Sequence, residues 1–255
     1  MKFRSFTCLF LVAFTTLLSA CQDDADSTTP QPGTLDIEVD HLVGNTPLTL
    51  NTGTYSTPLG QQFTVSTFNY YLSNIKLRKS DGTEYAEPES YHLVRESEAG
   101  SKLFTLTNVP AGDYTSLAFT IGVDSTRNVS GAQTGALDPA NGMFWTWNSG
   151  YIYTKLEGSS PQASGNKQLL FHIGGFKKPN NTIRTVSPSL NGATIQIRKD
   201  RTPAVHLQAD VLKMFTGPNP VDFSTLSNTM GGASSVRVAD NQAAGMFRVD
   251  HVHAN

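Results

Sequence analysis

The sequence predicts an all-β fold, an antiparallel β-sandwich with long loops and at most short helices. Apolar and polar residues alternate with a period of two over many short segments, as on strands with one buried face. Turn residues separate these segments: the 255-residue chain has 21 Gly and 13 Pro. No helical period is sustained across the alternating segments, so the chain reads as one sandwich-type domain.

The predicted strands follow one another from residue 35 onward. Leu35, Ile37 and Val39 face one side of the first strand and Asp36 and Glu38 the other. A long run rich in β-branched and aromatic residues follows at 63–79, and an Asp-Gly turn ends it. Asp240 is a candidate N-cap for one short helix at 241–246. Further strands are expected at 91–95, 102–109, 114–123, 151–157, 168–173, 193–198 and 205–214, with a long loop at 124–150.

The first twenty residues have the order of a lipoprotein signal peptide. Lys2 and Arg4 precede an apolar run at 6–18, and Leu-Ser-Ala-Cys then resembles a lipobox. Cleavage after residue 20 would leave Cys21 as the lipidated N-terminus. The alternative is a buried N-terminal strand of a cytosolic protein. We expect a polar tether at 21–33, one β-sandwich domain at 34–255, and a lipid anchor in the bacterial outer membrane, facing the periplasm or the surface.

Composition excludes several classes of function. Nineteen Lys and Arg against 21 Asp and Glu give a net charge of −2, too little positive field to bind nucleic acid. Outside the leader no segment is apolar enough to span a membrane, so we expect membrane contact through the lipid only. Cys8 leaves with the leader and Cys21 carries the lipid, which excludes disulfides and cysteine metal ligands. A metal site would therefore use His, Met or carboxylate.

No catalytic motif stands out. A Gly-x-Ser-x-Gly elbow with triad partners, a His-Glu-x-x-His pair and a phosphate loop are all missing from the sequence. Scattered Asp and Glu leave a glycosidase-type carboxylate pair open without supporting one. We therefore assign no catalytic residue.

Three of the six histidines occupy informative positions. His251 and His253 are two residues apart, so an extended strand would direct both imidazoles to one face, where they could bind one ion. The alternative is a frayed C-terminus. His172 precedes Gly174 and Gly175, and a bulge at these glycines could aim it into a site. The alternative for His172 is a core histidine bonded to a carbonyl.

The segment at 142–150 contains both tryptophans of the chain, Trp145 and Trp147, together with Met143. Three interpretations remain open: an aromatic plug in the core, a platform on which a sugar stacks, and a soft-metal site in which a thioether favours Cu(I).

The whole pattern resembles the MbnP-like copper-binding family. The similar stretches, in order along the chain, are Val-Asp-His at 39–41 with Gly44 and Pro47, Phe-Asn-Tyr-Tyr-Leu-Ser-Asn at 68–74, the tryptophan segment with its flanks at 122–158, Phe-His-Ile-Gly-Gly at 171–175, and Asp-His-Val-His at 250–253. The resemblance runs from about residue 35 to residue 255.

The resemblance implies an extracytoplasmic protein that binds Cu(I) and is not itself an enzyme. Its partner would be a di-haem cytochrome c peroxidase-like protein that oxidises a tryptophan to kynurenine, whose amine can coordinate the ion. On this chain the modified residue falls on Trp145, with Trp147 as the second candidate and Met143 as a possible neighbour. The implied histidine ligands are His41, His172, His251 and His253. The alternative function is a surface module that binds carbohydrate or protein on the tryptophan pair.

Overall fold

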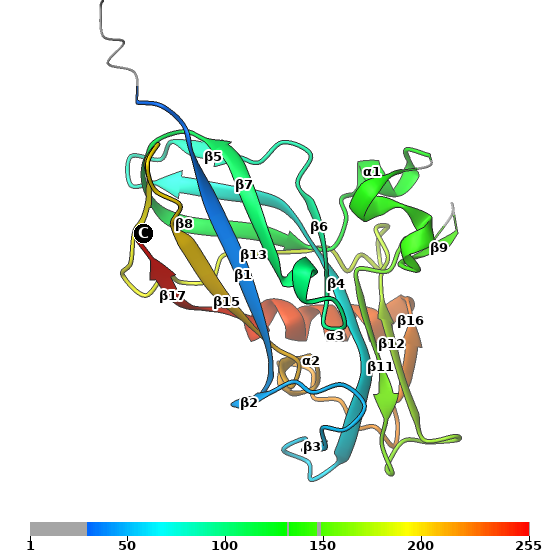
Figure 1. Cartoon of the computed structure of the whole chain (residues 1–255). Coiled ribbons are helices and arrows are strands. Elements are labelled where there is room, and N and C mark those ends of the chain that lie inside the picture. The colour runs from blue at the N-terminus through cyan, green and yellow to red at the C-terminus, as the bar shows by residue number, and fades with distance from the viewer. Residues whose placement is uncertain (1–29, 132, 147–148, 255) are drawn as a thin grey trace, which may run out of the picture.

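The computed structural model describes residues 30–131, 133–146 and 149–254, and these form two main β-sheets with few short helices (Figure 1). The predicted all-β sandwich class is confirmed. The leader, Cys21, and Trp147 in the tryptophan segment lie outside the described residues.

The first sheet is built around β1 (Gly33–Val43). On one side β1 pairs in parallel with β15 (Ala204–Asp210), and β15 pairs antiparallel with β17 (Phe247–His253) at the sheet edge. On its other side β1 pairs with β7 (Leu103–Val109) and with the short β2 (Thr46–Pro47). The strand that contains His251 and His253 is thus hydrogen bonded into the sheet and is not a frayed terminus.

The second sheet is built around the 18-residue strand β4 (Gln62–Lys79), which pairs with β8 (Gly112–Ile121) and β11 (Thr154–Ser159). Next to β11 lies β12 (Gln168–Ile173), which pairs in parallel with β16 (Asn228–Met230). The remaining strands of this sheet are β3 (Tyr55–Ser56), β5 (Glu84–Ala86), β6 (Tyr91–Arg95), β13 (Arg184–Val186) and β14 (Ile195–Ile197).

A separate small hairpin, β9 (Phe144–Thr146) with β10 (Gly150–Tyr151), carries the tryptophan segment. The helices are α1 (Ser125–Val129), α2 (Lys213–Thr216) and α3 (Gly232–Gly245). Turns of 3-10 helix occupy Ala99–Lys102, Gly135–Leu137 and Pro139–Asn141.

Two predicted element boundaries are wrong. Helix α3 begins at Gly232, nine residues before the predicted start, because its buried face is largely small or polar and gives little hydrophobic period. Asp240 therefore lies inside the helix, where it pairs with Arg184 at 2.7 Å. The strand predicted at 205–214 ends at Asp210, whose carboxylate accepts the backbone N–H of Leu212 and turns the chain into α2. The two parallel pairings were also not expected.

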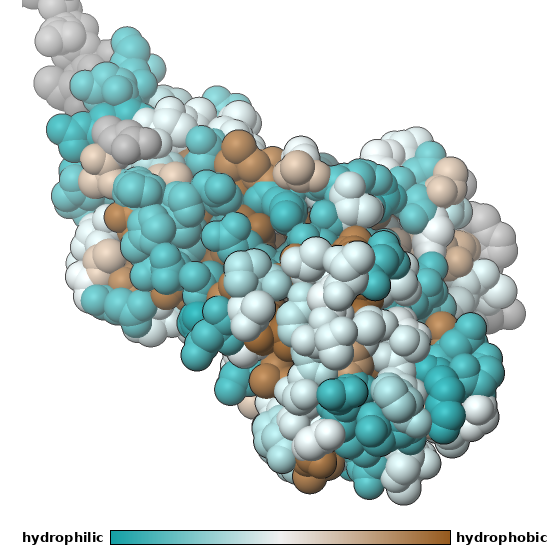
Figure 2. Space-filling view, turned by 60° about the horizontal axis from the view of Figure 1, so that its bottom comes forward, coloured by the Kyte–Doolittle hydropathy of each residue, from teal (hydrophilic) through white to brown (hydrophobic). Residues whose placement is uncertain are grey.

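The core lies between the sheets and is formed by the inward residues of the alternating strands, with many fully buried aromatic side chains. A second, smaller cluster packs around Tyr71 and Tyr151 under the hairpin. Large exposed hydrophobic side chains among the described residues are few and separate, and on the face in Figure 2 brown groups are interspersed with teal ones. None of the described helices has the length and apolarity needed to cross a membrane.

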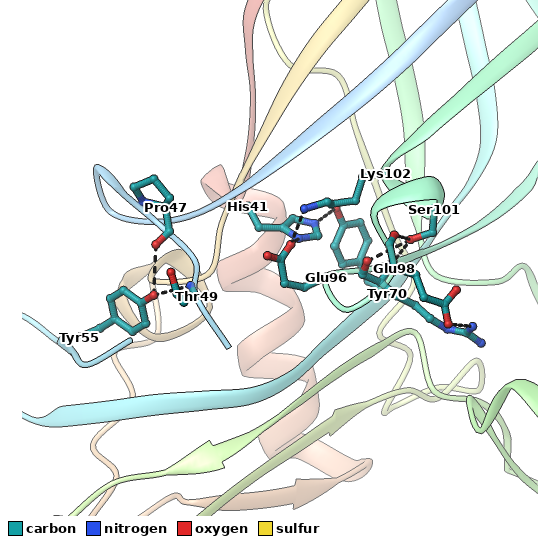
Figure 3. A network of polar contacts seen from close by, with 10 residues as sticks. His41, Pro47, Thr49, Tyr55, Tyr70, Glu96, Glu98, Ser101 and Lys102 are labelled. Atoms are coloured by element: carbon teal, nitrogen blue, oxygen red, sulfur yellow. Dashed lines mark hydrogen bonds and ion pairs between the residues drawn. The ribbon is translucent and has the colours of Figure 1, made fainter. Parts of the chain in front are cut away.

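A buried polar network connects the two sheets (Figure 3). His41 on β1 has a fully buried side chain, and its Nδ1 lies 2.7 Å from the carboxylate of Glu96, which follows β6. Its Nε2 lies 2.8 Å from the hydroxyl of Tyr70 on β4, and Lys102 also contacts Glu96 at 2.9 Å. Since a carboxylate only accepts, the neutral ring donates from Nδ1 and accepts the Tyr70 hydroxyl proton at Nε2. Burial lowers the pKa of His41 below its ordinary 6.5, against the opposing effect of Glu96.

We predict that this network makes stability fall in mild acid. The unfolded chain takes up a proton at His41 near pH 6.5 whereas the folded chain resists it, so the free energy of unfolding should drop as pH falls through 6.5 toward the lower folded-state pKa. The contribution is at most about 1.4 kcal/mol per pH unit. Denaturant unfolding from pH 8 to pH 5 in the presence of a chelator should give a shallower slope for His41→Gln. Equal slopes would contradict the assignment.

Candidate metal centre

Three histidines converge on the outer face of the first sheet at its C-terminal edge. His206 on β15 is paired in register with His251 on β17, and His253 follows two residues later on the same face. One ligand nitrogen from each ring can be chosen so that all three lie within 4.8 Å of one another. The rings of His206 and His251 stack at 4.2 Å between centroids, and His253 meets both edge-on. We call this set the histidine cluster.

A β-bulge places the closing pair on this face. The register shifts between His206 and Leu207, so that Asp250 is the extra residue of β17. Before the bulge, Phe247 and Val249 are buried, and strict alternation would have turned His251 inward as well. The one-residue shift changes the phase of the strand, and His251 and His253 point to solvent beside His206 instead.

The two closing imidazoles have the geometry of ligands. Their Nε2 atoms form a hydrogen bond of 3.0 Å, and this separation is close to the roughly 3.3 Å between two nitrogens bound at about 2.0 Å to one tetrahedral ion. Asp250 Oδ2 lies 2.7 Å from Nδ1 of His251 and accepts its proton. This leaves the lone pair of the neutral ring on Nε2, which is how an outer carboxylate orients a metal-binding histidine.

A cavity lies beside Trp145 on the hairpin strand β9. The half-buried indole lines a cavity of about 540 Å³ together with Gly174, Met230 and the N-terminal residues of α3. Two lysines line this cavity, and none of its lining residues in the described part of the chain carries a carboxylate. A Cβ at Gly174 would lie 2.8 Å from the indole Cζ3 and 2.6 Å from a backbone oxygen, so glycine there lets the ring pack against the strand end.

The other predicted neighbours of Trp145 lie in two different environments. His172 is on β12, directly beside Met230 of β16 in the sheet register, and its Nε2 contacts Glu157 at 2.8 Å. Met143 is buried in the smaller hydrophobic cluster and does not line the cavity. The thioether at the cavity is Met230, which is 55% exposed and was not predicted.

The described residues therefore separate the predicted ligands into three places. His251 and His253 come together, His172 lies on the side of Trp145, and His41 lies in the buried network with both ring nitrogens hydrogen bonded. The hairpin β9 and the strand β17 lie at opposite ends of the molecule in Figure 1. Trp145 and the histidine cluster are thus two distinct centres.

Sequence reasoning missed His206 and Glu38, which face solvent beside the predicted pair. Their signal was present but weak: each occupies a polar position in an alternating strand, between inward residues such as Val205 and Leu207. The sequence pattern does not show that β1, β15 and β17 are neighbours in the sheet, because the parallel pairing of β1 with β15 joins segments far apart in the chain.

Comparisons with known proteins agree with this fold. A solved structure described as MbnP from Methylosinus trichosporium is similar with a TM-score of 0.53 and 15% sequence identity, over 87% of this chain and 98% of that one. At this identity the likeness shows the fold alone. A comparison with curated proteins found no match. The family model described as MbnP matches residues 32–232, which is more than half of the chain, so the protein belongs to the MbnP family.

Proposed function

We propose that this protein is an extracytoplasmic copper-binding lipoprotein whose ion is held by His206, His251 and His253. The observation that carries the proposal is the convergence of three imidazoles from two paired strands on one point of the surface. Three protonated imidazoles would repel one another at this distance, whereas three neutral imidazoles can lie together. Neutral imidazoles also suit an ion of the copper or zinc type. The family resemblance selects copper from these.

A pre-ordered frame supports binding at this site. The backbones of both strands are fixed by sheet hydrogen bonds, and Asp250 already orients His251. An ion would therefore meet ligands that need little reorganisation, which favours affinity. Because the ligands come from β15 and β17, the ion would also tie the C-terminal strand to the sheet.

Oxidation of Trp145 is the second part of the proposal. A di-haem cytochrome c peroxidase-like partner would remove four electrons from the indole with two equivalents of peroxide as oxidant. The C2–C3 bond breaks, the two carbons gain one oxygen atom each, and two waters leave. Hydrolysis of the resulting formyl group releases formic acid and frees an aromatic amine. Indole has no lone pair available for a metal, whereas this amine has one.

The position of Trp145 suits such a reaction with a partner protein. Its indole is half-buried, so it is held in place while one side borders an open cavity. The amine formed there would lie on the side of the molecule that carries His172 and Met230, apart from the histidine cluster. The oxidised residue would therefore serve a separate centre, with His172 as the nearest of the predicted ligands.

Lipid attachment at Cys21 completes the proposal. The polar tether at 21–33 leads directly into β1, whose first residue is Gly33. A lipid at Cys21 would hold the domain at the outer membrane through a polar segment of about a dozen residues. The protein would act as a binding protein and as the substrate of its partner.

A second candidate function is carbohydrate binding at the Trp145 cavity. Trp145, Asn180 and Ser149 all line the cavity, and an aromatic wall beside polar residues suits a sugar ring. Glycan titrations that change tryptophan fluorescence in the wild type and not in Trp145→Phe would favour it. Fluorescence unchanged by a broad glycan panel would dismiss it.

We predict that removing either closing histidine abolishes tight copper binding. His251→Ala and His253→Ala should each weaken the affinity by at least about 100-fold, since loss of an outer partner alone costs 10- to 100-fold. Competition with a chromogenic chelator measures this. His92→Gln is the matched control, because His92 stacks on Phe104 away from the cluster. Wild-type affinity in both alanine variants would overturn the proposed ligand set.

The same copper titration on His41→Gln tests whether His41 is a ligand. The resemblance makes His41 a ligand, whereas its two nitrogens are already bonded to Glu96 and Tyr70. We expect its copper affinity to stay near the wild-type value.

We predict that protein purified from its native host carries kynurenine at Trp145. Peptide mass spectrometry across residues 136–155 should find the kynurenine mass there when a di-haem cytochrome c peroxidase-like partner is expressed in the same host. Trp145→Phe should remove the modification and Trp147→Phe should leave it. Two intact tryptophans with the partner present would exclude the maturation reaction while leaving the copper site at the histidine cluster untouched.

A further inference from the structure

Two positive charges lie at the cavity beside Trp145. They belong to Lys177 and Lys178, two exposed residues of the loop that follows β12 and lines the cavity. The ammonium of Lys177 lies 5.1 Å from the centre of the Phe176 ring, so a cation–π contact holds it near the cavity wall. In the described part of the chain neither lysine forms an ion pair, so both charges are available to a partner.

The carboxylates on the elements next to the cavity do not cancel these charges. Glu157 on β11 lies 2.8 Å from Nε2 of His172 and 3.6 Å from the ammonium of Lys155. Asp240 on α3 is paired with Arg184 at 2.7 Å. Each of these carboxylates thus has its own cation, and the two lysines remain as a local excess of positive charge. The chain as a whole carries −2, so this excess is a local feature and not a result of composition.

Apolar side chains line the same cavity. Met230 is one of four large hydrophobic side chains that are strongly exposed among the described residues. Phe176 and Trp145 line the cavity with it and are half-buried. Methionine and aromatic side chains beside a polar rim are typical of surfaces that bind other proteins. We call Trp145, Phe176, Met230, Lys177 and Lys178 the docking patch.

We propose that the docking patch binds an acidic surface of the protein that oxidises Trp145. The inference rests on the oxidation of Trp145 proposed above, and it names the surface and the charge by which the peroxidase-like partner is recognised. The two lysines attract acidic side chains and orient the partner during its approach. The indole then lies inside the interface, which shortens the path for removal of its electrons.

The charge beside the histidine cluster has the opposite sign. The carboxylates of Glu38 and Asp250 lie next to its imidazoles. The strand β17 that carries the closing histidines lies at the other end of the molecule from the hairpin β9 in Figure 1. An acidic partner is therefore attracted at one end and repelled at the other, and the uneven charge of the chain selects the end that carries Trp145.

The experiment follows kynurenine formation in protein expressed without the partner. The purified di-haem peroxidase-like partner and hydrogen peroxide are then added, and peptide mass spectrometry gives the rate at several concentrations of this protein. For Lys177→Glu with Lys178→Glu at low salt, we expect kcat/KM to fall at least about 10-fold. The loss should appear in KM with kcat unchanged, because the lysines act on encounter and not on the reaction. At about 1 M sodium chloride, where the Debye length is about 3 Å, the difference should disappear.

Two control variants isolate the charge of the docking patch. Lys177→Arg with Lys178→Arg keeps both charges and should react like the wild type. Lys199→Glu with Arg201→Glu makes the same change of net charge at two exposed residues between β14 and β15. That loop leads into β15 where β15 pairs with the start of β1, on the opposite side of the molecule from the hairpin β9 in Figure 1. This variant should keep a KM near the wild-type value.

The results separate this inference from the proposed oxidation. A wild-type KM at low salt in Lys177→Glu with Lys178→Glu would refute the docking patch and leave the oxidation standing. An equal rise of KM in Lys199→Glu with Arg201→Glu would also refute it, since net charge alone would then explain the effect. No kynurenine in the wild type would refute the oxidation, and the docking patch with it. Recovery of the wild-type rate at high salt shows that the charge-reversed protein is folded.

Discussion

The pairing of β17 with β15, beside the parallel pair of β15 with β1, is the constraint on which the candidate site depends. It places three outward positions from three distant parts of the chain in one row. Sheet geometry fixes the spacing between neighbouring strands at about 4.8 Å, which is the range over which side chains can share an ion. A metal site here needs no loop to close, because the backbone of each ligand is already held by its strand.

The bulge at Asp250 determines which side of the sheet receives the closing histidines. Upstream of it, Phe247 and Val249 contribute to the core, and downstream of it, His251 and His253 face solvent. One extra residue thus lets a single short strand bury its first half and present two histidines to solvent with its second half. The same residue supplies the carboxylate that accepts the hydrogen bond from His251, so the bulge determines both the side and the orientation of this ring.

The sequence predicted where the strands lie in the chain better than it predicted which strands pair with one another. Alternation located β1 and β8, the richness in β-branched and aromatic residues located β4, and the spacing of His251 and His253 correctly placed both on one face. His206 was missed because its role comes from register, which a local pattern does not encode. The start of α3 was misplaced for a related reason: its buried residues include Ser235, Asn241 and Gln242, which carry no hydrophobic signal.

The family match covers only part of the candidate site. It covers residues 32–232, so Glu38 and His206 lie inside it, whereas His251 and His253 lie beyond its end. Two of the three ligands of the proposed site therefore come from a strand that the family model does not include. Membership accounts for the sandwich, and sandwiches of one family can carry different sites. The claim that this chain binds copper at its C-terminal edge consequently rests on the geometry of β15 and β17, where one substitution at a time can test it.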